Sequence, residues 1–240
     1  MNKKYWIVGK NPVIEAIKNP KRKIIKILAK KENQEILKKL LNNIKMNTSI
    51  NVVEKNEIEK ITQINEINNQ GYAVLAEPIQ SANFKTFIKD NLNKSTIIIL
   101  DNVTDQRNIG AITRISAAFN FDGIIIDKRI YDEANPIFAK AASVSNEFIN
   151  IFTVSNINNA IRELKNNDYW ITGLDVNSTN YPESKDWSDK KKAIVLGSEG
   201  KGLKSLVKKN CDDLVKIKIN EKIESLNVSS SLAYLANYLL

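Results

Sequence analysis

Residues 96–127 decide the fold of this chain, and they read TIIILDNVTDQRNIGAITRISAAFNFDGIIID. The run at 96–100 is short, continuous and β-branched, which is typical of a strand buried on both faces of a sheet. A polar loop over 101–110 leads into a helix over 111–119, and 121–127 reads as the next strand. This order of strand, helix and strand predicts parallel strands in an α/β sheet.

The same alternation continues to the end of the chain. Further strands are predicted at 148–154, 169–176, 191–197 and 213–219, and further helices at 137–146, 156–167, 203–210 and 226–240. We therefore expect an α/β fold with a mostly parallel sheet. In such sheets the loops that leave the carboxyl ends of the strands build the ligand site.

The front of the chain is predicted to form a smaller α/β unit. A turn and short helix at 7–17 come first, followed by strands at 23–29, 49–54 and 72–78 and by helices at 33–44 and 57–65. The polar stretch after Pro78 is typical of a linker with a short helix. We predict an N-terminal domain at 1–78, a linker at 79–95 and a second domain at 96–240.

Missing residue types restrict the chemistry of this chain. It has no histidine and a single cysteine, Cys211. Intrachain disulfides, Cys/His zinc sites and catalytic triads or dyads that need histidine are therefore excluded, and we expect no metal site. Cys211 lies late in a predicted helix and is interpreted as a small packed residue.

The composition, 42% hydrophobic and 26% charged, is that of an ordinary globular protein. No apolar run is long enough to span a bilayer, and the basic first residues lack the apolar core of a signal peptide. We expect a cytoplasmic protein without a membrane partner.

Positive charge is unevenly distributed along the chain. Residues 1–95 contain 18 Lys and Arg against 9 Asp and Glu, whereas residues 96–240 contain 18 of each. The net charge of +9 therefore belongs to the first part. Such a division is typical of a polyanion-binding module joined to a chemical one, and a solvated Lys-rich surface explains it equally well.

The loop after the first strand of the second domain is rich in arginine. Arg107 and Arg114 are two of only five arginines in a chain that otherwise uses lysine. A guanidinium can bind a phosphate or carboxylate with two parallel hydrogen bonds, which an ammonium cannot. For Arg114 an ordinary surface ion pair is the alternative. Asn108 lies at the predicted helix start, where a role as N-cap competes with a functional one.

The loop after residues 191–197 is rich in glycine, with Gly197, Gly200 and Gly202 in GSEGKG. Glycines after a buried strand let the backbone approach a ligand closely or adopt positive φ. The spacing resembles a phosphate-binding P-loop, but that pattern ends in Gly-Lys-Ser/Thr and here Leu203 intervenes, so we reject an NTPase. Glu199 suits a cationic or hydroxyl-bearing ligand, with a solvated loop carboxylate as the alternative.

A third polar segment, IKINEKIESLNVSSSLA at 217–233, opens the last predicted helix. Ser225, Asn227 and the three serines 229–231 crowd the helix start. Such residues are often N-caps, yet one cap suffices. The surplus of small polar groups favours close packing or contact with a substrate.

These three loops resemble the motifs of the SpoU/TrmH branch of the SPOUT methyltransferases. The matching stretches are NVTDQRNIGAITRISAAF (102–119), IVLGSEGKGL (194–203) and VKIKINEKIESLNVSSSLAYLANYL (215–239). At the front, YWIVGKNPVIEAI (5–17) and NNQGYAVLAEP (68–78) are similar to the substrate-binding domain of ribosomal-RNA guanosine 2′-O-methyltransferases. The resemblance covers nearly the full chain, and the ordered trio with this front domain is specific.

The resemblance implies a homodimer whose second domain is a SPOUT α/β-knot, with the C-terminal segment threaded into a deep trefoil knot. The front would be a ribosomal-protein-like α/β RNA-binding domain. S-adenosylmethionine would be the cofactor, bound by the second and third loops at Gly197, Glu199, Gly202, Ile217 and Leu226. The family's catalytic-site positions match Asn108, Arg114, Glu199, Ser225 and Asn227.

The implied reaction is methylation of a ribose 2′-hydroxyl, most closely of a guanosine in 23S ribosomal RNA, and no DNA partner is expected. Alternatives are a tRNA ribose methyltransferase and a non-catalytic ribosome-assembly protein with the same fold. One departure is Asn69, where related ribosomal enzymes often have histidine. Because a guanidinium is effectively never deprotonated, we assign Arg114 to holding a phosphate and not to taking a proton.

Overall fold

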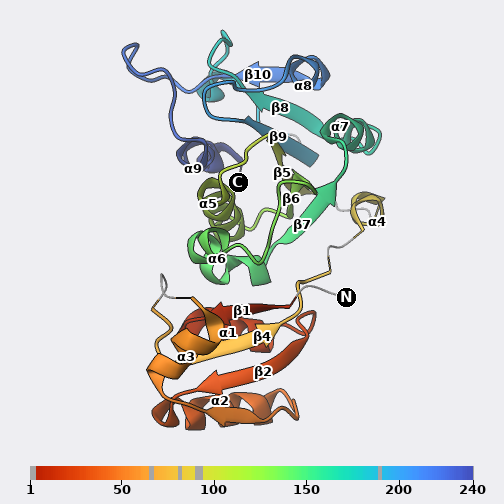
Figure 1. The fold of residues 1–240 in the computed structure, drawn as a ribbon. Coiled ribbons are helices and arrows are strands. Elements are labelled where there is room, and N and C mark those ends of the chain that lie inside the picture. The colour runs from red at the N-terminus through yellow and green to blue at the C-terminus, as the bar shows by residue number, and fades with distance from the viewer. Residues whose placement is uncertain (1–3, 65–67, 81–82, 90–93, 189–190, 240) are drawn as a thin grey trace. The chain divides into compact units, whose positions relative to one another are not determined.

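The computed structural model describes residues 4–64, 68–80, 83–89, 94–188 and 191–239. The chain forms two compact units (Figure 1). The first contains residues 1–80 together with 132–147, and the second contains 81–131 and 148–240. Within the described ranges, no helix has the length and apolar character needed to cross a membrane.

The first unit is built on a four-stranded sheet in the order β1-β4-β2-β3. β4 is antiparallel to β1 and β2, and β3 is parallel to β2. Its elements are β1 (Tyr5–Val8), α1 (Lys10–Lys18), β2 (Ile24–Ala29), η1 (Lys31–Asn33), α2 (Gln34–Asn43), β3 (Ile50–Val52), α3 (Lys55–Thr62), β4 (Tyr72–Ala76), α6 (Pro136–Ala142) and η2 (Ser143–Glu147). The short strand β1 was not predicted, because its four residues adjoin the turn at Gly9 and pair only with a strand far along the chain.

Helices cover both faces of this sheet because successive strand residues point to opposite sides. Ile27 and Ala29 of β2 pack in one apolar cluster with residues of α1 and α2. Leu28, between them, packs in a separate cluster with Ile58 of α3. The four-strand sheet is therefore buried on two sides.

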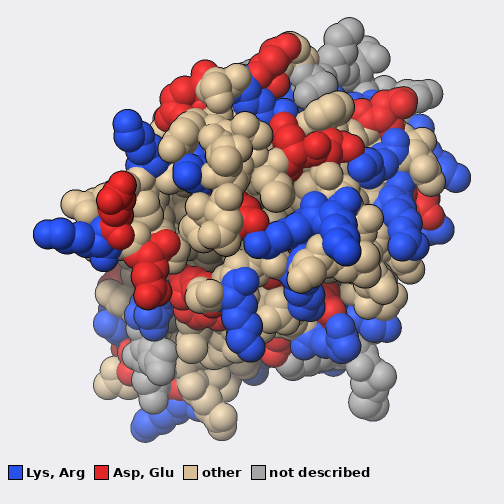
Figure 2. Space-filling view, turned by 90° about the horizontal axis from the view of Figure 1, so that it is seen from above, with Lys and Arg blue, Asp and Glu red and all other residues tan. Residues whose placement is uncertain are grey.

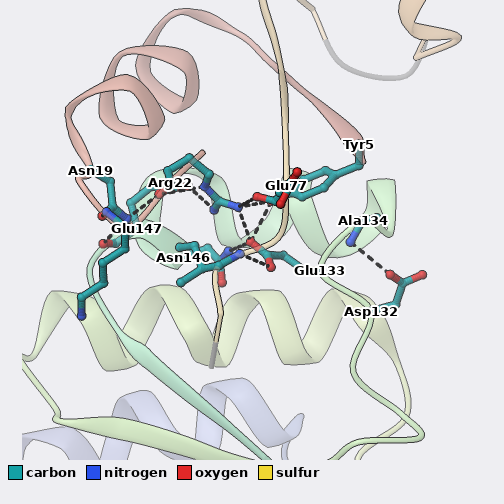
Figure 3. A network of polar contacts seen from close by, with 11 residues as sticks. Tyr5, Asn19, Arg22, Glu77, Asp132, Glu133, Ala134, Asn146 and Glu147 are labelled. Carbon is teal, nitrogen blue, oxygen red and sulfur yellow. Dashed lines mark hydrogen bonds and ion pairs between the residues drawn. The ribbon is translucent and has the colours of Figure 1, made fainter. Parts of the chain in front are cut away.

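A buried polar network holds residues 132–147 in the first unit (Figure 3). The Arg22 guanidinium donates to Glu133 Oε1 at 2.7 Å and to Glu147 Oε1 at 2.5 Å, and the arginine side chain is fully buried. Tyr5 Oη and Asn146 Nδ2 also donate to Glu133 Oε1, each at 2.7 Å. Burial, followed by the Glu133 charge, raises the pKa of Tyr5. Removing one partner of such a buried pair typically costs about 3–5 kcal/mol.

The turn before β4 explains the asparagine at position 69. Asn69 is fully buried, and its Oδ1 accepts a hydrogen bond from the Gly71 N–H at 2.8 Å. Gln70 and Gly71 both have positive φ, at 52° and 77°. Asn69 therefore stabilises the tight turn that leads into β4.

The second unit is built on a six-stranded sheet in the order β10-β8-β9-β5-β6-β7, with all neighbouring strands parallel. Its elements are α4 (Phe84–Lys89), β5 (Ser95–Asp101), α5 (Gln106–Ala118), β6 (Gly123–Asp127), β7 (Asn150–Val154), α7 (Ile157–Lys165), β8 (Trp170–Leu174), η3 (Pro182–Ser184), β9 (Lys191–Gly197), α8 (Ser205–Asn210), β10 (Asp213–Val215) and α9 (Val228–Leu239). The predicted α/β fold with a mostly parallel sheet is confirmed.

Two helical layers bury this sheet. Residues of α4, α7 and α8 pack in one cluster with Ile97, Ile99 and Val195 of the central strands. α5 and α9 contact each other and cover the other side, where α5 contacts β6 and α9 contacts β9 (Figure 1). Burial on both faces explains the continuous apolar runs of β5, β6 and β9. The trefoil knot and the division at residues 78 and 95 stay predictions.

Candidate active site

The first and second loops leave the sheet side by side. β5 and β9 are parallel neighbours in register, and their last residues, Asp101 and Gly197, are directly paired. Asp101 is buried, and its Oδ2 accepts a hydrogen bond from the Lys204 N–H at 2.7 Å. This contact ties the end of the glycine loop to the start of the arginine loop.

The arginine loop turns into α5 five residues earlier than predicted. Asp105 is the N-cap, and its side chain accepts a hydrogen bond from the Arg107 N–H at 2.9 Å. The prediction of Asn108 as a possible N-cap is therefore wrong, because an acidic residue one turn earlier satisfies the helix start. Asn108 is 6% exposed in the first turn, where its amide is available for contacts outside the helix.

The glycine loop folds back on itself. Ser198 and Gly202 exchange two backbone hydrogen bonds, at 3.2 and 2.9 Å. Gly200 and Gly202 have φ of 78° and 63°, in the region that favours glycine. A Cβ on Gly197 would lie 2.3 Å from the carbonyl carbon of Gly202, so any side chain there would displace the loop.

The third segment places Asn227 at the start of α9. Its Oδ1 accepts hydrogen bonds from the Ser229 N–H at 3.0 Å and from the Ser229 hydroxyl at 2.6 Å. This is the capping role that serine and asparagine residues at helix starts commonly have. The Asn227 amide nitrogen remains free for a second role.

Side chains of all three loops meet in one hydrogen-bonded ring. Asn227 Nδ2 donates to Asn108 Oδ1 and to Glu199 Oε1, both at 2.8 Å. Asn108 Nδ2 donates to Glu199 Oε1 at 2.9 Å, which closes the ring. Within the described part of the chain, Glu199 Oε2 has no hydrogen-bond partner. This carboxylate oxygen can therefore accept a hydrogen bond from a hydroxyl group, or a proton.

Arg114 and Ser225 lie outside this ring. Arg114 is exposed on α5, and its guanidinium makes no hydrogen bond or ion pair with any residue that the structure describes. The alternative of a surface ion pair within the described chain is therefore not observed. Ser225 is exposed in the segment before α9.

A cavity of about 250 Å³ lies between the glycine loop and the third segment. Ser225 and Glu199 lie on its wall. All five residues predicted to bind the cofactor line it: Gly197, Glu199, Gly202, Ile217 and Leu226. Glu199 thus belongs both to the cavity and to the ring of amides.

The exit of β8 also lines this cavity and was not predicted to do so. Residues 174–177 contribute, together with Lys208 of α8. No glycine or arginine cluster marks this exit, so the signal is the sheet order alone, which places β8 next to β9. Within the described residues, no group of three or more Cys, Asp or Glu side chains is arranged to hold a metal ion.

Charges of both signs lie on the face of the protein shown in Figure 2. Figure 2 looks down on the side of β10 and α8, where Lys and Arg side chains lie among Asp and Glu side chains. In this view Lys and Arg side chains are more numerous in the right half, and Asp and Glu side chains lie mainly on the left and along the upper edge.

Comparison with family models divides the chain in two. Residues 95–236 match the SpoU rRNA methylase family. Residues 6–82 match a model described as RNA 2′-O ribose methyltransferase substrate binding. Together these matches span both compact units.

Relatives and solved structures agree with these matches. The chain is 34% identical over 227 residues to a protein of Borreliella burgdorferi named as an uncharacterized tRNA/rRNA methyltransferase, covering 91% of this chain and 92% of that one. It is 35% identical over 231 residues to a protein of Staphylococcus aureus named as TrmH family tRNA/rRNA methyltransferase, covering 93% and 90%.

Two crystal structures share the fold at low sequence identity. The AdoMet-bound rRNA methyltransferase from Sinorhizobium meliloti has a TM-score of 0.84 at 19% identity, covering 98% of this chain and 86% of that one. The SpoU methyltransferase AviRb from Streptomyces viridochromogenes, in complex with AdoMet, has a TM-score of 0.79 at 16% identity, covering 98% and 89%. This chain, whose three loops meet in one hydrogen-bonded ring, belongs to the SpoU rRNA methylase family of RNA methyltransferases.

Proposed function

We propose that this protein transfers a methyl group from S-adenosylmethionine to a ribose 2′-hydroxyl of RNA, at a guanosine of 23S ribosomal RNA, and that it acts as a homodimer. The observation that carries the proposal is the position of Glu199. Its carboxylate lines the cavity and also accepts hydrogen bonds from Asn108 and Asn227. One side chain can therefore contact a bound donor and a nucleotide placed beside the ring.

The cavity suits an adenosine-containing donor. Ile217 and Leu226 offer apolar surface for a purine, and the glycines of the folded loop let its backbone N–H and C=O groups come close to a ligand. When bound, the sulfonium supplies an already activated methyl group. The residues of the chain then need to orient the two partners and to accept one proton.

The ring and Arg114 suit the acceptor nucleotide. The exposed Arg114 guanidinium can hold a phosphate with two hydrogen bonds and stabilise negative charge that develops on the 2′-oxygen. Asn108 and Asn227 hold Glu199 in place, with Ser225 on the cavity wall nearby. The hydroxyl proton leaves to Glu199 Oε2, to the RNA phosphate or to water.

The first unit suits a role in RNA binding. It carries exposed lysines at 21, 23, 31, 38, 39 and 45, and a matching family model is described as substrate-binding. Attraction between lysine side chains and phosphates supplies most of the affinity in non-specific nucleic-acid binding. Methyl transfer would then depend on the second unit.

The test is a map of ribose methylation across ribosomal RNA and tRNA in cells with and without the protein. Loss of one 2′-O-methylguanosine in 23S rRNA is expected. Loss of a methylated tRNA ribose would instead identify the tRNA alternative. Calorimetry with S-adenosylmethionine tests the donor directly, because a ribosome-assembly protein that lacks catalysis would bind none.

A further inference from the structure

Asp175 occupies a position of the donor cavity that none of the three motifs covers. It directly follows β8, and β8 lies beside β9, the strand that ends in the glycine loop. Asp175 is 8% exposed, and both it and its ion-pair partner Lys208 line the cavity. Ligands of parallel α/β sheets bind outside the carboxyl ends of the strands, which is where this carboxylate lies.

The Asp175 carboxylate is held in one orientation. Lys208 Nζ lies 2.5 Å from Oδ2, and the Asn177 N–H donates to Oδ1 at 3.2 Å. The Asp175 N–H donates to the Val215 carbonyl at 2.9 Å, and its own carbonyl accepts from the Ser178 N–H at 3.0 Å. A residue fixed by strand, helix and turn is preorganised to bind a ligand.

The remaining acceptor capacity of this carboxylate defines the ligand chemistry. A carboxylate has about four lone-pair positions, and the contacts above use one on each oxygen. Because Lys208 already neutralises the negative charge of Asp175, a ligand does not need a positively charged group to bind there. Neutral hydroxyl groups are then the suitable donors.

A ribose diol is the hydroxyl pair that this cavity suits. Beside these polar groups the cavity has apolar walls, with Leu174 and Val176 next to Asp175 and with Ile217 and Leu226 on the third segment. That combination suits a nucleoside, whose base packs on apolar side chains while its sugar hydroxyls point to the acid. Dinucleotide-binding folds use an acidic residue in the same way to bind the ribose hydroxyl.

We propose that Asp175 is a donor-binding residue whose carboxylate accepts hydrogen bonds from the ribose hydroxyls of S-adenosylmethionine, with Lys208 as its positioning residue. The proposal rests on the proposed function, since it names the part of the same donor that this residue contacts. It predicts that Asp175 discriminates between nucleosides with and without the diol.

The test compares two ligands in calorimetry: S-adenosylhomocysteine and its 2′,3′-dideoxyribose analogue. Asp175→Asn should weaken binding of S-adenosylhomocysteine about tenfold or more, as expected for a lost hydrogen bond to a charged group. Wild type and Asp175→Asn should bind the dideoxy analogue with equal affinity, which also shows that the variant is folded. Equal losses for both ligands, or no loss for either, would overturn the assignment of Asp175.

Asp212→Asn is the matched control. Asp212 also pairs with a lysine, Lys165 Nζ at 2.6 Å, and accepts a backbone hydrogen bond from the Ile171 N–H at 2.8 Å, but it does not line the cavity. It should bind both ligands as the wild type does, and a selective loss there would also overturn the proposal. A wild-type protein that binds neither ligand would refute the proposed function itself, which separates the two failures.

Discussion

Asn227→Ser is expected to slow methyl transfer while leaving α9 nearly as stable as in the wild type. The side-chain amide of Asn227 has two roles, one for its oxygen and one for its nitrogen. Its oxygen caps α9 through Ser229, and its nitrogen donates to Asn108 and Glu199. Serine is as good an N-cap as asparagine but cannot supply the amide donors. The substitution therefore removes the ring contacts alone.

The expected size of the effect follows from these contacts. Each hydrogen bond contributes a net of about 0.5–1.5 kcal/mol. Because Asn227 is exposed, water can replace part of both bonds, so we take the lower values, about 1–1.5 kcal/mol for the pair. At about 1.4 kcal/mol per decade, kcat/KM should fall about tenfold. The unfolding free energy should change by less than about 0.5 kcal/mol.

Initial rates with a 23S rRNA fragment and thermal denaturation together measure the two roles. Asn227→Ala should show the same loss of rate and, in addition, a loss of about 1 kcal/mol in stability from the missing cap. Asn156 is the control, because its side chain caps α7 by accepting from the Asn159 N–H at 3.1 Å. Asn156→Ala should lose the same stability at full rate. Wild-type turnover of Asn227→Ser, or an equal rate loss in Asn156→Ala, would refute the reasoning.

Three further outcomes are expected. Arg114→Lys should lower turnover about tenfold at saturating RNA, because an ammonium cannot form two parallel hydrogen bonds to a phosphate. Unchanged turnover, together with unchanged RNA affinity in filter binding, would contradict this role. Hydrogen bonds from Arg129 hold the pKa of Asp127 at about 2, and Arg129→Ala should raise it toward about 3.9 in an NMR titration. The pKa of Asp127 is lower in the folded protein than in the unfolded chain, so its pairing with Arg129 stabilises the fold above about pH 4. This stabilisation is lost as the pH falls through 2. In thermal denaturation, Arg129→Ala and the wild type should therefore differ at neutral pH and become equally stable below about pH 2. Burial, and next the charge of Asp212, raises the pKa of the Cys211 thiol to about 12. Iodoacetamide at pH 8 should therefore alkylate Cys211 far more slowly in the native protein than in the unfolded chain. Rapid labelling of the native protein would contradict the packed environment of this thiol.

Local composition was enough to locate the three loops, because their glycine, arginine and serine clusters are visible without the fold. The order of the strands was not visible. Asp175 escaped prediction for that reason, since LDVNS carries no unusual cluster and matters only because β8 lies beside β9. β1 was missed for a related reason: its pairing with β4 joins residues more than sixty positions apart. Periodicity within one segment does not contain such pairings.

The start of α5 shows why side-chain roles are harder to predict than loops. Asp105 and Asn108 are both good N-caps, and the choice between them moves the helix start by one turn. Ile109 is 1% exposed and Ile112 is fully buried, so the apolar side of α5 already begins within its first turn. A helix capped by Asn108 would begin at Ile109 and would contain both isoleucines as well, so this apolar pattern does not distinguish the two caps. Contacts with distant parts of the chain distinguish the two residues. The Asn108 amide binds Glu199 and Asn227, whereas the Asp105 side chain caps α5. Such contacts are not visible in the local sequence.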